Sequence, residues 1–204
     1  MRKRTALRLS RSLRPLLELM DTLFFGIRLR RDRQRGLALA RLLARFNEPL
    51  AFRYLAHAYD RGIGVSRDAK KAFSNWRRAA VLGDAESQAA TAYALAMGRG
   101  VRRNLQRAAD WDKLAARSGN ASAQYNLGQA YSRGEGLPKN PRRAFRWWLC
   151  AAKQGHVKAQ CNVGAAYEAG VGVKRDLRSA GAWYKRAARS GDTLAQTGLS
   201  RLRS

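Results

Sequence analysis

Glycines return at intervals of 36 residues along almost the whole chain, and this spacing limits what the chain can fold into. The most regular series consists of Gly26, Gly62, Gly98, Gly134 and Gly170. Two further series keep the same interval, and they consist of Gly64, Gly100, Gly136 and Gly172, and of Asn47, Gly83, Gly119, Gly155 and Gly191. A fixed period of this length is typical of repeat proteins, in which each unit buries its apolar face by stacking on its neighbours.

A polar column with the same period predicts where helices begin. It consists of Asp32, Asp68, Asn104, Asn140 and Asp176. Asp and Asn side chains accept hydrogen bonds from the unpaired N–H groups of a first helical turn. A glycine about fifteen residues later ends that helix in the left-handed conformation, and the first glycine series ends the helix before it. We therefore expect two helices per unit, helix A and helix B, joined by a Gly-x-Gly turn.

The predicted B helices carry the residues of a stacked core. Pairs of small residues such as Ala79–Ala80 and Ala151–Ala152 allow helices to approach closely. Bulky aromatic residues lie one turn earlier, and we expect them to pack between repeats: Trp76, Trp111, Trp147, Trp148, Trp183 and Tyr184. Hydrophobic residues make up 46% of the chain, which is enough for such a core.

One unit shows the complete pattern. It reads Ala-Gln-x-x-Leu-Gly-x-x-Tyr-x-x-Gly-x-Gly from Ala123 to Gly136, and then Ala-x-x-Trp-Trp-x-x-Ala-Ala-x-x-Gly from Ala144 to Gly155. This pattern resembles the Sel-1-like repeat (SLR), a subclass of the tetratricopeptide-like (TPR-like) helical repeats. The resemblance implies an all-α fold, a right-handed α-α solenoid. We expect a basic tail over residues 1–14, a degenerate N-terminal hairpin over 15–50, four repeats over 51–191 and a C-terminal capping helix over 192–204.

The charge of the chain allows two interpretations. Forty-one Lys and Arg residues face 14 Asp and Glu residues, which gives a formal net charge of +27. Such an excess favours a polyanionic partner, namely nucleic acid, an anionic membrane or an acidic protein. However, Arg outnumbers Lys by 32 to 9, as a GC-rich genome would produce without selection for binding. The sequence leaves both interpretations open.

Residues for catalysis or for metal binding are scarce, and we predict that the chain is not an enzyme and needs no cofactor. The two histidines, His57 and His156, lie far apart in the sequence, without the Cys, His and carboxylate spacing of a metal site. The Gly-x-Gly pairs end helices instead of joining a strand to a helix, so they do not indicate a phosphate loop. Some proteins with this repeat have been labelled β-lactam hydrolases, but no serine here forms the Ser-x-x-Lys motif.

The cysteines and the N-terminus bear on the compartment. Secreted relatives pair cysteines about eight positions apart, but Lys153 stands eight residues before Cys161. We therefore expect Cys150 and Cys161 to be independent, although a different pairing geometry stays open. Glu18 and Asp21 interrupt the only Leu-rich part of the N-terminus, and the longest uncharged stretch is too short and polar to span a bilayer. These observations favour a cytoplasmic protein.

Two surfaces are candidates for binding. In TPR-like proteins the inner face of helix A is the usual ligand groove, and the resemblance assigns to it the groove residues Arg53, His57, Arg61, Tyr93, Met97, Tyr125, Gln129 and Arg133. Asp60, Glu86, Lys158 and Glu168 accompany them. Tyr, Met and Arg are frequent anchors of protein partners. An ordinary solvated face is the alternative.

The second surface is a basic ridge at the start of helix B. Its first column precedes each helix cap and consists of Arg31, Arg67, Arg103, Lys139 and Arg175. Its second column follows three positions after the cap and consists of Arg35, Lys71, Arg107 and Arg143. A cation at a helix N-terminus opposes the helix dipole, so we infer that helix stability does not explain the first column. Similar repeats often carry Lys in the second.

Together these observations favour a non-enzymatic scaffold or adaptor that binds a protein partner through the helix A groove. The alternative function is binding of nucleic acid or an anionic membrane through the basic ridge and the N-terminal tail. Loss of binding with added salt would favour the alternative, because contacts between exposed charges are screened.

Overall fold

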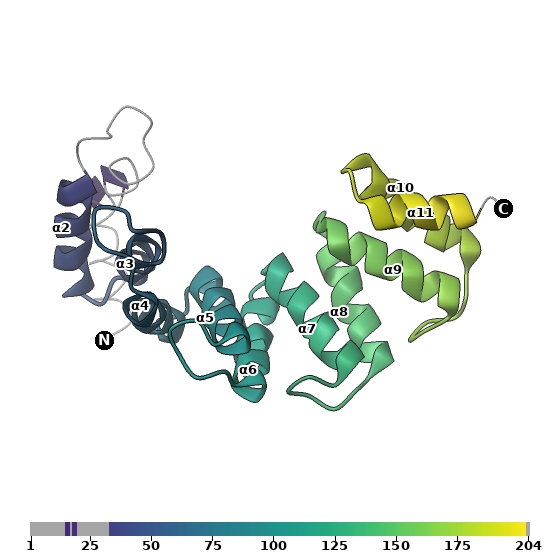
Figure 1. The fold of residues 1–204 in the computed structure, drawn as a ribbon, viewed down its shortest axis with the longest axis horizontal. Helices are drawn as coiled ribbons and strands as arrows, with labels where there is room; N and C mark the ends of the chain where they lie inside the picture. Colours follow the sequence, from purple (N-terminus) through teal and green to yellow (C-terminus); the bar gives the residue numbers. More distant parts are fainter. Residues whose placement is uncertain (1–14, 17, 20–32, 203–204) are drawn as a thin grey trace, which may run out of the picture. The chain divides into compact units, whose positions relative to one another are not determined.

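The computed structural model describes residues 15–16, 18–19 and 33–202, and this part of the chain is helical without strands (Figure 1). Its ten helices from residue 33 onward are α2 (Arg33–Ala44), α3 (Pro49–Arg61), α4 (Ala69–Val81), α5 (Ala85–Met97), α6 (Leu105–Arg117), α7 (Ala121–Arg133), α8 (Pro141–Lys153), α9 (Val157–Ala169), α10 (Leu177–Arg189) and α11 (Thr193–Arg201). Each contacts its sequence neighbours within a compact unit. The predicted all-α fold of stacked hairpins is confirmed.

The B helices begin where the polar column predicts. Asp68 and Asn104 each accept a hydrogen bond of 2.9 Å from the backbone N–H three residues later, at the start of α4 and α6. Asn140 and Asp176 do the same for α8 and α10. Each of these bonds satisfies an N–H group that the helix itself leaves unpaired. The first member of the column, Asp32, lies outside the described residues.

The A helices have a second set of caps, which the sequence analysis did not predict. The capping side chains belong to Asp84, Asn120, His156 and Asp192, each one residue after a glycine of positive φ. Helix α3 differs, because its cap Glu48 makes no side-chain cap bond and Pro49 occupies the first helical position. Proline suits this position, because its missing N–H group would have no partner within the helix there in any case.

The Gly-x-Gly turns hold successive repeats together. The first glycine of each turn ends helix A in the left-handed conformation, for example Gly62 at φ 72° and Gly134 at φ 76°. The second glycine lies directly on the preceding B helix. A Cβ atom at Gly100 would stand 2.0 Å from the Ala69 carbonyl oxygen, and one at Gly136 would stand 2.3 Å from that of Leu105. A side chain at either position would push the turn away from that helix.

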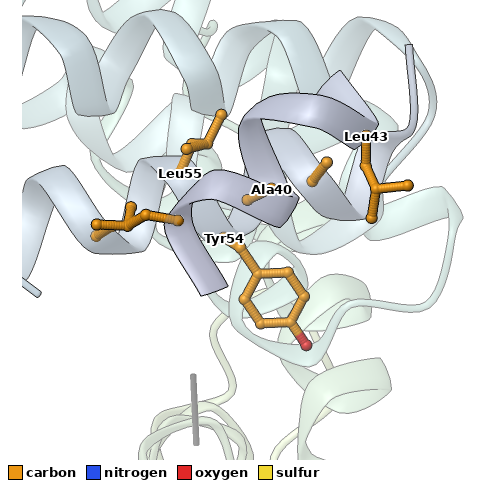
Figure 2. Packing of buried hydrophobic residues seen from close by; sticks show 7 residues of the cluster. Ala40, Leu43, Tyr54 and Leu55 are labelled. Atoms are coloured by element: carbon orange, nitrogen blue, oxygen red, sulfur yellow. The ribbon is translucent and has the colours of Figure 1, made fainter. Parts of the chain in front are cut away.

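The chain forms two compact units, Met1–Arg103 and Asn104–Ser204. In the first unit, Leu37 and Leu43 of α2 pack with Tyr54 and Leu55 of α3, and all four side chains are buried (Figure 2). In the second unit, Tyr184 of α10 packs among residues of α9 and α11. Helix α11 thus covers the end of the last hairpin, as a terminal capping helix does.

The aromatic column is buried at only some of its predicted positions. Trp76, Trp148 and Tyr184 are buried, which confirms the prediction for these three. In contrast, Trp111, Trp147 and Trp183 are half-buried on the flanks of their helices. Gly128 leaves room for Trp148, since a Cβ atom there would lie 2.3 Å from the indole ring.

Two further expectations concern the cysteines and the membrane. Cys150 is exposed and Cys161 is buried, and neither forms a disulfide. Burial raises the pKa of the Cys161 thiol to about 11, with the nearby Asp192 carboxylate acting in the same direction. Within the described residues, none of the helices combines the length and apolar character that crossing a bilayer requires.

Candidate functional site

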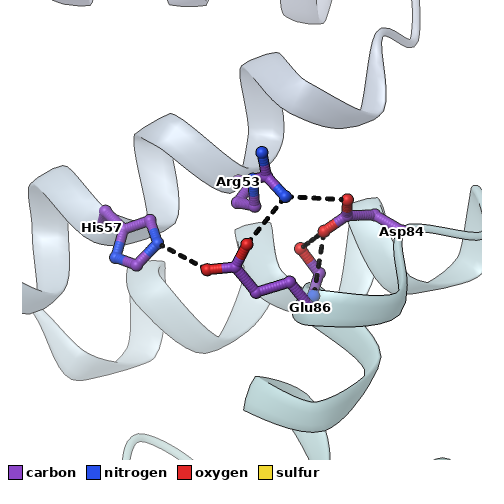
Figure 3. Close-up of polar contacts among 5 residues, drawn as sticks. Arg53, His57, Asp84 and Glu86 are labelled. Carbon is purple, nitrogen blue, oxygen red and sulfur yellow. Dashed lines mark hydrogen bonds and ion pairs between the residues drawn. The ribbon is translucent and has the colours of Figure 1, made fainter. Parts of the chain in front are cut away.

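In the first unit, two groove residues are fixed by acidic side chains at the start of α5 (Figure 3). The Arg53 guanidinium of α3 donates to Asp84 Oδ1 at 3.2 Å and to Glu86 Oε2 at 2.8 Å. His57, one turn later on α3, lies with Nε2 3.6 Å from Glu86 Oε1. Because Asp84 is also the cap of α5, this cluster joins the helix A segments of two successive repeats.

His57 is partly enclosed, and its surroundings oppose its protonation. Its ring meets the Trp76 ring edge-on, with centroids 4.4 Å apart. Burial lowers the pKa of His57, and the Arg61 and Arg53 cations act in the same direction, while the Glu86 carboxylate raises it. The neutral imidazole therefore offers a polar edge beside an aromatic surface.

A small aromatic pocket opens beside this cluster, and we call it the aromatic pocket. It has a volume of about 210 Å³ and lies among α3, α4 and α5. Trp76 and Phe73 supply its aromatic walls, together with several alanines of α4 and α5. At its edge, Arg99 lies over the Tyr93 ring, 5.9 Å from the centroid, and pairs with Asp60 at 3.0 Å. An apolar hollow is thus bordered by one cation and one anion.

The other groove residues of the first unit are more exposed. Tyr93 is 48% exposed and Met97 is 59% exposed, both on α5. Arg61 lies exposed in the last turn of α3. Arg99 was not among the predicted groove residues, although it could have been found: it occupies the place between the two turn glycines where Ile63 and Val171 stand in other repeats.

In the second unit, the predicted groove residues Tyr125, Gln129 and Arg133 follow one another along α7. The Tyr125 ring stacks on the His156 ring with centroids 4.6 Å apart, and burial raises the Tyr125 pKa. Gln129 accepts a hydrogen bond of 3.2 Å from Asn162 of α9. Arg133 lies 3.9 Å from Glu135. That these residues share one surface with Tyr93 stays a prediction.

The first column of the basic ridge has a structural role that the sequence analysis overlooked. Arg67, Arg103 and Arg175 each donate from Nε to the backbone carbonyl seven residues earlier, in the last turn of the preceding A helix. A cation stabilises the C-terminal end of a helix. For these three arginines, the inference that helix stability does not explain the column is therefore wrong, because the helix that they stabilise is the preceding one. Arg31 lies outside the described residues.

The second column packs on the tyrosines of helix A where a tyrosine is present. The Lys71 ammonium lies 5.5 Å from the centre of the Tyr59 ring, and the Arg143 guanidinium lies 5.6 Å from that of Tyr131. The corresponding partner of Arg107 would be Leu95, so a cation–π contact is not available there. The ridge is thus a set of separate local contacts, of which only some leave the cation free for a partner.

An acidic side chain is buried in the second unit at a position that is aromatic elsewhere. Asp112 of α6 is one repeat before Trp148, and it is 7% exposed. Burial raises its pKa to about 8, although a hydrogen bond from Asn126 acts in the opposite direction. Its Oδ1 atom is buried without a hydrogen-bond partner. The described residues contain no group of three or more His, Cys, Asp or Glu side chains that could hold a metal ion.

The comparison with known families decides the identity of these hairpins. The profile described as Sel1 repeat matches four consecutive segments, residues 49–84, 85–120, 121–156 and 157–192. The chain belongs to the Sel1 repeat family. Each matched segment consists of one A helix and the B helix that follows it, so the segments of the Sel1 profile follow the hairpins of the structure.

Solved Sel1 structures from bacteria are similar to the chain. A Sel1 repeat protein from Oxalobacter formigenes shares 30% identity at a TM-score of 0.79, over 88% of this chain and 74% of that protein. A protective antigen present in uropathogenic Escherichia coli strains, which displays an SLR fold, shares 29% identity at a TM-score of 0.87. That match covers 98% of this chain but only 43% of the antigen. The sequence matches no curated protein.

The Sel1 fold generally mediates protein–protein interaction, and Sel1 proteins are typically non-enzymatic scaffolds. This agrees with the general class of function that the sequence predicts. It does not assign a partner, and it does not assign the surface through which a partner is bound.

Proposed function

We propose that this Sel1 repeat protein is a non-enzymatic adaptor that binds a protein partner through the helix A side of its hairpins. The aromatic pocket of the first unit is the observation that supports this proposal. Its volume of about 210 Å³ is smaller than the pockets that hold drug-sized ligands, which begin at about 300 Å³. The pocket therefore suits a single apolar side chain of a larger partner.

The border of the pocket suits the polypeptide that carries such a side chain. Asp60 can accept hydrogen bonds from backbone N–H groups, and Arg99 can donate to carbonyl groups. Both side chains lie beside the exposed ring of Tyr93. Rigid aromatic and arginine side chains around a desolvated centre are the residues in which binding energy concentrates.

A peptide array probed with the full chain tests this proposal, because the array samples many peptide sequences at once. The best-binding peptide is then titrated into the wild type and into Tyr93→Ala, and we expect the substitution to weaken binding by about 1–3 kcal/mol. Ala90→Phe, which fills the pocket, has the same expected effect. Leu194→Ala is the matched control, since Leu194 is an exposed apolar residue of α11. Equal affinities for all four proteins would refute the proposal.

The groove residues of the second unit give a further test of the same function. Tyr125→Ala or Arg133→Ala is expected to weaken binding of a longer partner by a similar amount while leaving the fold intact. Glu substitutions at Arg67, Arg103 and Lys139 should affect such a partner little, provided that thermal unfolding shows that the helix ends bonded by Arg67 and Arg103 are retained. Binding that survives the groove changes but disappears on ridge reversal would instead favour the alternative function, binding of nucleic acid or an anionic membrane.

A further inference from the structure

A second pocket lies between the N-terminal end of α8 and the Gly-x-Gly turn that follows α9, and we call it the basic pocket. Its volume is about 640 Å³. Three cationic side chains line it, those of Lys139, Arg142 and Lys174, and none of its lining residues is acidic. This pocket belongs to the second unit alone, and it is independent of the aromatic pocket.

The three cations of the basic pocket are free to bind an anion. At the position of Lys139, the other repeats have arginines whose Nε atoms bond to the preceding helix. Lys139 makes no such bond, and across the described part of the chain neither it nor Arg142 nor Lys174 has a hydrogen bond or ion pair from its side chain. The helix cap here is the neutral Asn140, whereas α4 and α10 begin with an aspartate.

The walls of the basic pocket are held in place. A Cβ atom at Gly172 would lie 2.2 Å from the carbonyl oxygen of Pro141, so the turn rests directly on the first residue of α8. This contact fixes the distance between the turn segment that carries Lys174 and the helix that carries Arg142. An anion would therefore meet cations whose backbones are already positioned, which reduces the entropic cost of binding.

The surroundings of the basic pocket indicate which anion it binds. Val173 lines the pocket, and Val171, which stands between two glycines that line it, is 51% exposed. Proteins that bind single-stranded nucleic acid stack bases on aromatic rings, and this pocket has no aromatic lining residue. Exposed aliphatic residues beside free cations instead suit a bilayer surface, where the cations attract anionic headgroups and the aliphatic side chains enter the interface.

We propose that the basic pocket docks the chain on an anionic phospholipid membrane by binding the phosphate headgroups. Lys139, Arg142 and Lys174 contact the phosphates, and Val171 inserts among the lipid glycerol groups. Attraction of this kind falls off within a Debye length, which is about 10 Å at 0.1 M salt. Binding therefore weakens as salt is added.

Co-sedimentation of the full chain with vesicles of phosphatidylglycerol and phosphatidylcholine in equal parts tests this proposal. Replacing Lys139, Arg142 and Lys174 together by Gln should weaken vesicle binding by about a hundredfold, since each basic residue near a membrane surface contributes about a factor of five. The matched control replaces Arg117, Lys153 and Arg189 by Gln. It removes the same charge from the other ends of B helices in the same unit. Equal losses in the two triple variants, or no loss in the first, would overturn the proposal.

A second substitution distinguishes a membrane from a nucleic acid. Val171→Ser keeps every charge, and we expect it to weaken vesicle binding several-fold while leaving binding of an oligothymidylate unchanged. The proposal is wrong if Val171→Ser leaves vesicle binding intact while the pocket triple variant loses oligothymidylate binding, because the pocket then binds nucleic acid. Thermal unfolding of each variant verifies that the helices are retained. Neither result depends on Tyr93 or on a peptide partner, so this proposal and the adaptor function can fail separately.

Discussion

Helices α6 and α8 occupy the same place in successive repeats, but the side chains at the centre of their buried faces differ in chemistry. Both begin at an Asn cap, and both receive a hydrogen bond at their C-terminal end, where Gln124 donates to Ala116 and Gln160 donates to Ala152. At the centre of the buried face, however, α6 has the carboxyl group of Asp112, whereas α8 has the indole ring of Trp148.

This difference shows which contacts define the repeat. The bonds made to the backbone recur at each of these helices, because helix ends leave carbonyl and N–H groups that must be paired. The side chain that fills the interior can differ from one repeat to the next, and so can its contacts. Trp148 lies over Gly128, whereas Asp112 takes a hydrogen bond from Asn126. The repeat therefore depends more on its backbone contacts than on a fixed core residue.

The largest expected effect comes from removing the buried indole ring of α8. Trp148→Ala should lower the free energy of unfolding by about 3–5 kcal/mol, because Gly128 offers no side chain to fill the space that the ring leaves. Chemical denaturation of the full chain measures this loss. The neighbouring half-buried Trp147→Ala is the control and should cost clearly less. Equal losses would show that the two ring positions are equivalent.

The buried carboxyl group of α6 predicts that the stability of the fold depends on pH. The pKa of Asp112 in the folded chain is about 8, above its ordinary value of 3.8, so the unfolded chain loses this proton first as the pH rises. The contribution of Asp112 to stability is thus complete below pH 4 and is lost as the pH rises towards 8. Asp112→Asn should remove this dependence and stabilise the chain at pH 8 by on the order of 2–4 kcal/mol relative to the wild type.

The test is the difference between Asp112→Asn and the wild type as a function of pH. Hydrogen bonds lower the pKa values of Asp68, Glu168 and Asp176, so these groups stabilise the fold at higher pH in both proteins and cancel in the difference. A difference that is constant from pH 4 to pH 8 would contradict the raised pKa of Asp112.

The shared backbone contacts should respond alike in the two repeats. Gln124→Ala and Gln160→Ala each remove a buried donor from a carbonyl group of the preceding helix end. That carbonyl group then keeps only its backbone bond from the N–H of Gly119 or Gly155. We expect each to cost about 1–2 kcal/mol in urea denaturation. A loss at only one of the two positions would contradict the view that these bonds define the repeat.

The smallest expected effect concerns the caps that follow α6 and α8. Asn120 caps α7, whereas His156 caps α9 by accepting a hydrogen bond at Nδ1 from the Ala159 N–H at 3.3 Å. Burial lowers the pKa of His156 below 6.5, so the stability that its neutral ring contributes is present above that pH and is lost as the pH falls. His156→Asn should therefore gain up to about 1 kcal/mol relative to the wild type between pH 7 and pH 5.

Most of the fold was predictable from the sequence, because the features that end helices are local. An Asp or Asn before a helix and a glycine after it act within a few residues, and their 36-residue period is visible without a structure. The caps of the A helices are just as local, but they were missed because their column is less uniform. That column reads Asp84, Asn120, His156 and Asp192, and a histidine among capping residues is unusual enough to hide it.

The candidate sites were predictable only in part, because they depend on contacts between repeats. The sequence indicated that Arg53, His57 and Tyr93 lie on one side of the A helices. It did not indicate that Asp84 and Glu86 would bind Arg53, since these residues are more than 30 positions away. Nor did it separate the arginines that bond to a preceding helix from Lys139, which makes no such bond, because both types have the same place in the repeat.

The recurring glutamine bond has a consequence for how such a chain changes length over generations. Suppose that an in-frame deletion removes residues 121–156 and joins Asn120 to Val157. The carbonyl of Ala116 then accepts a hydrogen bond from Gln160 in place of Gln124. Asp112 likewise accepts one from Asn162 in place of Asn126. Both of these contacts are thereby replaced by a contact of the same kind. Unequal recombination between copies of the gene can therefore add or remove whole hairpins and still produce a chain that folds.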